Sequence, residues 1–429
     1  MKANILTSGF RFFASDQWKI ITDVSIFLLF FFCVSSLKAQ IPLKKYPKSS
    51  FKELFVEAVG DTAMASLLTC APGNESYELY GHTALRIRGG SGGKDMVYNY
   101  GYFNFNRPNF VWHFILGETD YSLRAIPMSH FYGLYTSERR WIEEQELNLT
   151  CEEVERLTVA LEKNCEQAIR EDWTYRYNYL TDNCTTRAIE QIRQALDGTL
   201  VLPKASTTTY RAALHRYTAA HPWSQLGNDM LLGAACDDSI NAEQQLFLPI
   251  DAENLLQSAQ VQGKDGTLRP LVKAKKRIAD IPDKPADTRW PPMVYVVLLL
   301  LLTIALTIYE KVKRKKLWAY DVLLLTMQGV AGCLIAFMLC FSKHPTVDSN
   351  LHIFWLNPLP LFFLWPVMRN LRLGRPARFF WLQTGLLAVF FVLANLQIQN
   401  IPLETLLLAL CLLIRAAWHA PRLKFMNNE

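Results

Sequence analysis

The chain has 429 residues, enough for one or two domains, and its sequence divides into two regions of different composition. Residues up to about 290 carry charges throughout, as soluble domains do, whereas the sequence from Met293 onward is mostly apolar with basic patches between apolar runs. The net charge of +6 comes partly from those patches, KVKRKK (311–316) and RNLRLGRPAR (369–378). The charge therefore gives little support for a nucleic-acid partner and instead indicates a membrane protein.

The N-terminal residues 1–40 predict a secretory signal peptide. A basic region precedes a short apolar core, residues 24–34, and the small residue Ala39 ends the segment. The core is shorter than the roughly 20 residues that a membrane helix needs. Leu37 stands where cleavage favours a smaller residue, so an uncleaved anchor is the alternative.

Residues 41–264 are predicted to form an exported α+β domain. FKELFVEAVG (51–60) predicts a helix and MASLLTCAPG (64–73) a strand, while GHTALRIRGG (81–90) and KDMVYNYGYFNF (94–105) predict a hairpin across a Gly-rich turn. LNLTCEEVERLTVALEKNCEQAIRE (147–171) predicts a helix with a capping box at Thr150 and Glu153. The result is a small antiparallel sheet with helices.

A charged, Pro-containing segment, residues 265–291, predicts a linker to a helical membrane domain over 292–420. If the first domain is outside, every basic segment falls on the cytoplasmic side, as such segments prefer. The protein is therefore expected in the inner membrane as a multi-pass protein. The tight QNIP turn before the last span leaves an interfacial hairpin as an alternative there. About five spans are predicted, at 293–309, 317–341, 351–368, 379–398 and 401–418.

The exported domain holds an odd number of cysteines, which indicates at least one free thiol. Cys165 lies on the apolar stripe of its helix and is predicted to be a small core residue. Cys184 differs, because it stands in the polar turn NYLTDNCTTR at the start of a predicted helix. The exported cysteines are Cys70, Cys151, Cys165, Cys184 and Cys236.

A cysteine nucleophile needs a lowered pKa, which a helix N-terminus or a neighbouring imidazole can provide. Asp182 or Asn183 can cap the helix of Cys184, and N–H groups there could stabilise an oxyanion. His82, at the start of a strand just after Gly81, is the best candidate base, and a satisfied structural histidine is the alternative.

Weaker candidates have ordinary explanations beside functional ones. Arg86 could face a lipid headgroup or lie on a solvated strand face, and His344 and Asn350 could contact lipid or belong to a solvated loop. The aromatic residues from Tyr98 to Trp112 are predicted to belong partly to the core and partly to an anchor at the membrane interface. They could also line a groove for an acyl chain. No Cys/His spacing fits a metal-ligand set, so neither a metal nor a cofactor is expected.

Several segments in this order resemble the Lnb-type family of bacteroidete envelope proteins. They are YGHTALRI, VYNYGYFNF, PNFVWHFILGETDYSL, ERRWIEEQELNLT, YNYLTDNCTTR and, in the membrane half, SKHPTVDSN and WLNPLPL. The resemblance implies a circularly permuted papain-like thiol fold, in which a histidine on a strand precedes a cysteine on a helix. It also implies His82 and Cys184 as the catalytic pair, an Asn183–Cys184 helix start, and Asn99 as a third, orienting residue. An ordinary strand polar residue is the equal alternative for Asn99.

The activity that this resemblance implies is lipoprotein N-acylation. An acyl chain would pass from a phospholipid donor, through a thioester, to the α-amine of a diacylglyceryl lipoprotein. Two other classes stay open: a papain-like envelope hydrolase, such as a peptidoglycan amidase or endopeptidase, and a non-enzymatic envelope scaffold. The membrane spans count against the hydrolase, and the odd thiol counts against the scaffold.

Overall fold

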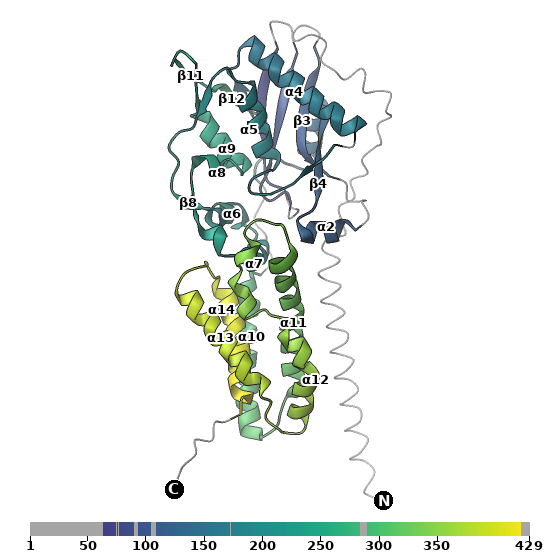
Figure 1. Ribbon diagram of the computed structural model, residues 1–429, viewed down its shortest axis with the longest axis vertical. Coiled ribbons are helices and arrows are strands. Elements are labelled where there is room, and N and C mark those ends of the chain that lie inside the picture. Colours follow the sequence, from purple (N-terminus) through teal and green to yellow (C-terminus); the bar gives the residue numbers. More distant parts are fainter. Residues whose placement is uncertain are drawn as a thin grey trace, which may run out of the picture.

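The computed structural model describes residues 63–421 except 74, 76, 90–92, 104–108, 172 and 284–289. The predicted signal peptide and the predicted helix at 51–60 lie outside these residues. The described chain forms two stacked parts, a domain built on a sheet and a bundle of helices (Figure 1).

The sheet has seven strands in the order β12-β5-β1-β2-β3-β4-β6, and every neighbouring pair is antiparallel. The predicted strand at 64–73 and the predicted hairpin are its central strands, because their alternating side chains bury a face on each side of the sheet. The strands are β1 (Met64–Cys70), β2 (His82–Arg88), β3 (Asp95–Tyr102), β4 (Asp120–Pro127), β5 (Ile142–Leu147), β6 (Tyr175–Arg176) and β12 (Val272–Ala279).

Helices cover both faces of this sheet. On one face, α4 (Cys151–Arg170), α5 (Cys184–Ala195) and α9 (Pro249–Gln257) pack on the main core, and α3 (Met128–Ser137) covers the other face. The capping box at the start of α4 is confirmed, since the Thr150 side chain accepts from the Glu153 N–H and the Glu153 side chain accepts from the Thr150 N–H. Cys165 is 7% exposed within the core, which confirms its structural role.

The prediction of a linker over residues 265–291 is wrong in its first half. These residues include the edge strand β12, which pairs with β5 along its length. The sequence of β12 is basic and that of β5 is acidic, and ion pairs cross the ladder from Lys275 to Glu143 at 2.6 Å and from Lys273 to Glu146 at 2.9 Å. Opposite charges across a strand pair stabilise it, and lysines on an edge strand discourage further pairing.

Smaller elements complete the first domain. A helix of seven residues, α2, stands between β3 and β4. Of two short sheets, one has the order β11-β10-β7 and the other pairs β8 with β9. These elements are α2 (Phe110–Leu116), β7 (Thr199–Val201), β8 (Thr208–Thr209), α6 (Tyr210–Thr218), α7 (Pro222–Leu231), η2 (Ala234–Asp237), β9 (Ser239–Ile240), α8 (Ala242–Gln245), β10 (Gln260–Gln262) and β11 (Leu268–Pro270).

Helices occur at all five predicted span positions. Three segments, Pro292–Lys313, Trp318–Phe341 and Leu351–Arg372, are long and apolar enough to cross a membrane. The other two, α13 and α14, have 17 residues each, about 25 Å of helix against a hydrocarbon core of about 30 Å. The bundle comprises α10 (Pro292–Lys313), α11 (Trp318–Phe341), η3 (Val347–Ser349), η4 (Leu351–Phe354), α12 (Leu359–Arg372), α13 (Phe379–Asn395) and α14 (Leu403–His419).

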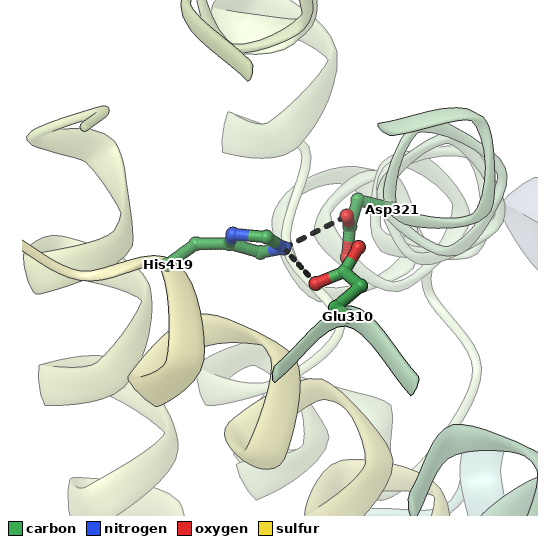
Figure 2. Close-up of side chains that lie close together, drawn as sticks. All are labelled: Glu310, Asp321 and His419. Carbon is green, nitrogen blue, oxygen red and sulfur yellow. Dashed lines mark hydrogen bonds and ion pairs between the residues drawn. The ribbon is translucent and has the colours of Figure 1, made fainter. Parts of the chain in front are cut away.

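A buried ionic network explains why an arginine interrupts the last helix. Arg415 of α14 donates to both oxygens of Asp321 at 2.6 and 2.8 Å and to Glu310 at 3.0 Å. His419, one turn further on, lies 2.9 Å from Asp321 (Figure 2). All four side chains are at most 4% exposed, and they tie α14 to α10 and α11.

Hydrogen bonds join the two parts through the segment that follows α11. Tyr179 donates to the Pro345 carbonyl at 2.9 Å, and the Gly233 N–H donates to the Thr346 carbonyl at 2.9 Å. Gln399, after α13, donates to the Leu232 carbonyl at 3.0 Å. Buried backbone groups at the junction are thus paired across it, so the two parts form a continuous structure.

Candidate active site

Cys184 is the first residue of α5, and Asn183 caps that helix. The Asn183 side chain accepts from the N–H groups of Thr185 and Thr186, and its amide donates to the Phe247 carbonyl. The predicted capping role of Asp182 is wrong, because its carboxylate binds Arg187 at 2.6 and 2.7 Å. The Cys184 N–H has no intrahelical carbonyl partner, as for any first helical residue, so it is positioned to donate beside its own thiol.

The sheet opens where Cys184 packs against it. Pairing of β1 with β2 continues to Cys70 opposite His82, but pairing of β2 with β3 stops at Leu85 opposite Tyr98. The first residues of β2 and the last residues of β3 therefore diverge. His82 lies at the start of β2 in this opening and acts electrostatically on the Cys184 thiol.

Asn99 of β3 orients the His82 ring. The His82 Nε2 lies 3.3 Å from the Asn99 Oδ1, and the Asn99 amide donates to the Val97 carbonyl at 3.4 Å. Because an amide oxygen only accepts, this contact places the proton on Nε2 and leaves Nδ1 to accept a proton from the thiol. Of the two predicted alternatives for Asn99, this contact supports the orienting one.

The surroundings of Cys184 favour its thiolate. Burial would raise the pKa of the Cys184 thiol, but the charge of His82 and a hydrogen bond with its ring oppose this. The Thr83 N–H and the Thr185 hydroxyl add further hydrogen bonds, and the net effect holds the pKa of Cys184 below its ordinary value. A lower pKa increases the thiolate fraction at a given pH, and the thiolate is the nucleophilic form of cysteine.

Other cysteines of this domain behave in the opposite way. Burial raises the pKa of Cys70, of Cys165 and of Cys236, the last to about 12. These three thiols are buried in the core, where the charged thiolate is disfavoured. Among these four cysteines, Cys184 is the one whose pKa is lowered.

Four supporting residues give no signal in the sequence. Tyr135 of α3 stacks on the His82 ring with centroids 6.4 Å apart, and Arg140 covers the Tyr135 ring at 4.6 Å. The hydroxyl of Thr185 lies 3.0 Å from that of Thr83, which fixes the start of α5 against β2. Each depends on a contact between distant segments, so no local pattern marks it.

An aromatic wall lines the β3–β4 side of the thiol. The rings of Tyr121 and Tyr177 stack 4.2 Å apart, and Phe103 packs on Tyr121 at 4.8 Å. Burial raises the pKa of Tyr121 to about 12 and that of Tyr177 still further, so both stay neutral. The predicted aromatic patch divides accordingly, since Tyr98 and Tyr100 belong to the core and Trp112 is exposed.

Gly101 completes the wall, and its backbone makes room for the thiol. It occupies an irregularity in the β3–β4 ladder with φ at +91°, and a Cβ there would lie 3.5 Å from the Cys184 Cβ. Bulges next to active sites re-aim the chain in this way.

We expect Gly101→Val to destabilise the protein by roughly 1–3 kcal/mol and to slow alkylation of Cys184, because a branched side chain is strained at this φ and crowds the thiol. Gly266→Val is the matched control: φ there is +83°, and nothing lies within 4 Å of the added Cβ. Thermal unfolding measures the strain, and iodoacetamide labelling of Cys184 measures the crowding. Equal labelling of the two variants would contradict a role for Gly101 at the thiol.

Structural partners occupy the three weaker candidates. Arg86 is paired with Asp95 at 2.5 Å and Glu144 at 2.9 Å inside the sheet domain. His344 lies 2.6 Å from the Phe114 carbonyl, and Asn350 donates to the carbonyls of Met230 and Leu231. Instead of the predicted lipid contact, Arg86 stabilises the sheet domain, and His344 and Asn350 hold the two parts of the chain together.

One group of described residues could supply metal ligands. The ligand atoms of Glu310, Asp321 and His419 lie within 4.8 Å of one another (Figure 2). However, the Arg415 guanidinium already bonds both carboxylates, so a cation is in place there. A second cation would face strong repulsion at that distance, and we assign the group to the stability of the bundle.

The fold and the site together define a class of protein: an α+β domain with a cysteine–histidine pair, seated on a helical membrane domain. Comparison with family models gives the particular family. The model of the Lnb N-terminal periplasmic domain matches residues 52–216, and that of the Lnb transmembrane domain matches residues 284–424. The chain belongs to the Lnb family, and its sheet domain is periplasmic. No curated protein and no solved structure matched the chain.

Proposed function

We propose that this protein is a lipoprotein N-acyltransferase. It moves an acyl chain from a phospholipid, through a thioester on Cys184, to the α-amine of the N-terminal cysteine of a diacylglyceryl lipoprotein. The observation that carries the proposal is an activated thiol in a domain bonded directly to a membrane bundle. A thiol in this position can attack a lipid ester without extracting the lipid into water.

The first half-reaction forms the thioester. His82 accepts the Cys184 proton at Nδ1, while Asn99 holds Nε2. The thiolate attacks the ester carbonyl, and the Cys184 N–H at the start of α5 donates to the oxyanion. The C–O bond of the ester breaks, His82 returns the proton to the leaving oxygen, and lysophospholipid departs.

The second half-reaction forms the amide. The lipoprotein amine attacks the thioester carbonyl and loses a proton to His82. The C–S bond breaks, and the Cys184 sulfur leaves as the thiolate, which His82 stabilises. The neutral aromatic wall beside the thiol suits an acyl chain in both steps.

The proposal includes a fold and a topology. His82 on a strand and Cys184 on a later helix support a circularly permuted papain-like arrangement. All five helices of the bundle cross the inner membrane, with α13 and α14 as a short hairpin held by the Arg415 network. The basic segments at 311–316 and 369–378, each a helix end with the loop after it, then lie in the cytoplasm.

The deciding experiment is Cys184→Ala in the native host, with mass spectrometry of lipoprotein N-termini. We expect the N-acyl chain to disappear while the diacylglyceryl group stays. Cys151→Ala is the control, because Cys151 is exposed and lies at the start of α4, away from the site. Unchanged lipoproteins would refute the transferase, and altered cell-wall fragments in that case would favour the hydrolase alternative.

A further inference from the structure

The short helix α2 exposes aromatic side chains although it belongs to the periplasmic domain. Trp112 is 53% exposed and Phe114 is 50% exposed. Large exposed apolar groups in a cluster usually mark an interaction surface. The neighbours of α2 show which partner this surface meets.

The membrane bundle caps the last turn of α2. Ser342 donates to the Ile115 carbonyl at 2.8 Å, the Lys343 N–H donates to the Leu116 carbonyl at 2.8 Å, and His344 bonds the Phe114 carbonyl. The Ile115 and Leu116 carbonyls stand in the last turn, where a helix leaves its carbonyls unsatisfied, and the Phe114 carbonyl also accepts from the Gly117 N–H at 3.0 Å. The segment after α11 satisfies them and so fixes α2 at the periplasmic end of α11 (Figure 1).

Trp112 lies beside the last turn of α11. Its ring is 4.9 Å from the ring of Phe337, and Phe341, one turn further on, is 63% exposed. The exposed side of α2 is thus continuous with the lipid-facing side of a membrane helix.

A second aromatic group stands at the same end of the bundle. Trp223 of α7 packs on Tyr295 at the start of α10, with centroids 5.5 Å apart, and its indole donates to the Trp290 carbonyl at 2.9 Å. Since α10 starts at the end where α11 finishes, both groups lie at one level. Tryptophan and tyrosine at a common level mark the boundary between water and membrane.

At the opposite end of the bundle, the tryptophan rings are covered by basic side chains. There Arg372 lies 4.0 Å over Trp318, Arg369 lies 5.5 Å over Trp365, and Lys316 lies 5.5 Å over Trp418. Aromatic rings paired with cations are typical of the cytoplasmic boundary, where basic residues gather. The two boundaries together locate α2 in the periplasmic one.

We propose that α2 is an interfacial helix whose Trp112 and Phe114 side chains insert between the acyl chains of the periplasmic leaflet. Gly101, where an added Cβ would lie 3.5 Å from the Cys184 Cβ, belongs to β3, the strand before α2, and Tyr179 ties the Cys184 turn to the same segment after α11. Lipid bound at α2 would therefore lie next to a segment that is bonded to the Cys184 turn. That α2 delivers the acyl donor rests on the proposed function, whereas its insertion into the leaflet does not.

Fluorescence quenching tests the insertion. Full-length protein is placed in phosphatidylethanolamine–phosphatidylglycerol vesicles with or without brominated acyl chains. The contribution of Trp112 is the emission of the wild type minus that of Trp112→Phe. We expect brominated lipid to quench it at least twofold, and to leave the contribution of Trp173, obtained from Trp173→Phe, unquenched. Equal responses of the two tryptophans would overturn the proposal.

A second variant tests delivery separately. Trp112→Ser/Phe114→Ser is expected to raise the apparent KM for phospholipid in vesicles about tenfold while iodoacetamide labelling of Cys184 stays at the wild-type rate. An unchanged KM would overturn delivery by α2. If the wild type transfers no acyl chain at all, the proposed function fails, and the quenching result still decides whether α2 is interfacial.

Discussion

His82→Ala is expected to reduce acyl transfer roughly 10²–10⁴-fold, the usual contribution of a general base. The variant also removes the imidazole whose charge and hydrogen bond lower the pKa of Cys184. Burial, which raises that pKa, is then left with less opposition. The thiol should therefore titrate at a higher pH than in the wild type and react more slowly at pH 7.

The measurement is the rate of Cys184 alkylation by iodoacetamide as a function of pH, followed by mass spectrometry in a Cys151→Ser background. The wild-type midpoint should lie below that of an ordinary thiol, and the His82→Ala midpoint above the wild-type one. His130→Ala is a matched control, because His130 is exposed on α3. Coincident midpoints for His82→Ala and the wild type would exclude His82 as the partner of the thiol.

Asp321→Asn is expected to destabilise the bundle by about 3–5 kcal/mol, the usual cost of breaking a buried ion pair from one side. Arg415 is 2% exposed and donates two hydrogen bonds to this carboxylate. The variant leaves a buried guanidinium with one charged partner, Glu310. The helix most affected is α14, because Arg415 and His419 both belong to it.

Thermal unfolding in detergent measures the loss, and maleimide labelling of Cys411, which is 1% exposed in α14, reports whether that helix has moved. Asp348→Asn is the control, since this carboxylate is exposed in η3 and should change stability by less than about 0.5 kcal/mol. Removing both charges in Asp321→Asn/Arg415→Gln should recover part of the stability. An Asp321 variant as stable as the Asp348 variant would show that the network contributes nothing.

The sequence predicts those parts of the fold that local rules decide. The capping box of α4 and the helix start at Cys184 depend on residues within one turn, and the strands around His82 depend on alternation. These predictions agree with the structure. Position alone made His82 the best candidate base, and the family resemblance strengthened its pairing with Cys184, because about a hundred residues separate the two in the chain.

The parts that could not be predicted depend on distant partners. The basic segment at 272–279 resembles a linker until the acidic strand β5 is placed beside it. In the sequence, Arg86 resembles a surface residue, and only the fold shows its ion pair with Glu144. Asp182 and Asn183 are equally good candidate caps in the sequence, and only the fold shows that Asp182 pairs with Arg187. His344 and Asn350 bond carbonyls of another domain, which no pattern in their own loop indicates.

The position of β12 at the end of the periplasmic domain determines when that domain can finish folding. The strand pairs with β5, more than a hundred residues earlier, and α10 begins soon after it. The sheet can therefore be completed only when nearly the whole domain has crossed the membrane, just as the first bundle helix arrives for insertion. The carbonyls at the end of α2 gain their hydrogen-bond donors later still, because the segment that caps them is synthesised after α11. The surface that holds the thiol site at the membrane is thus among the last to form.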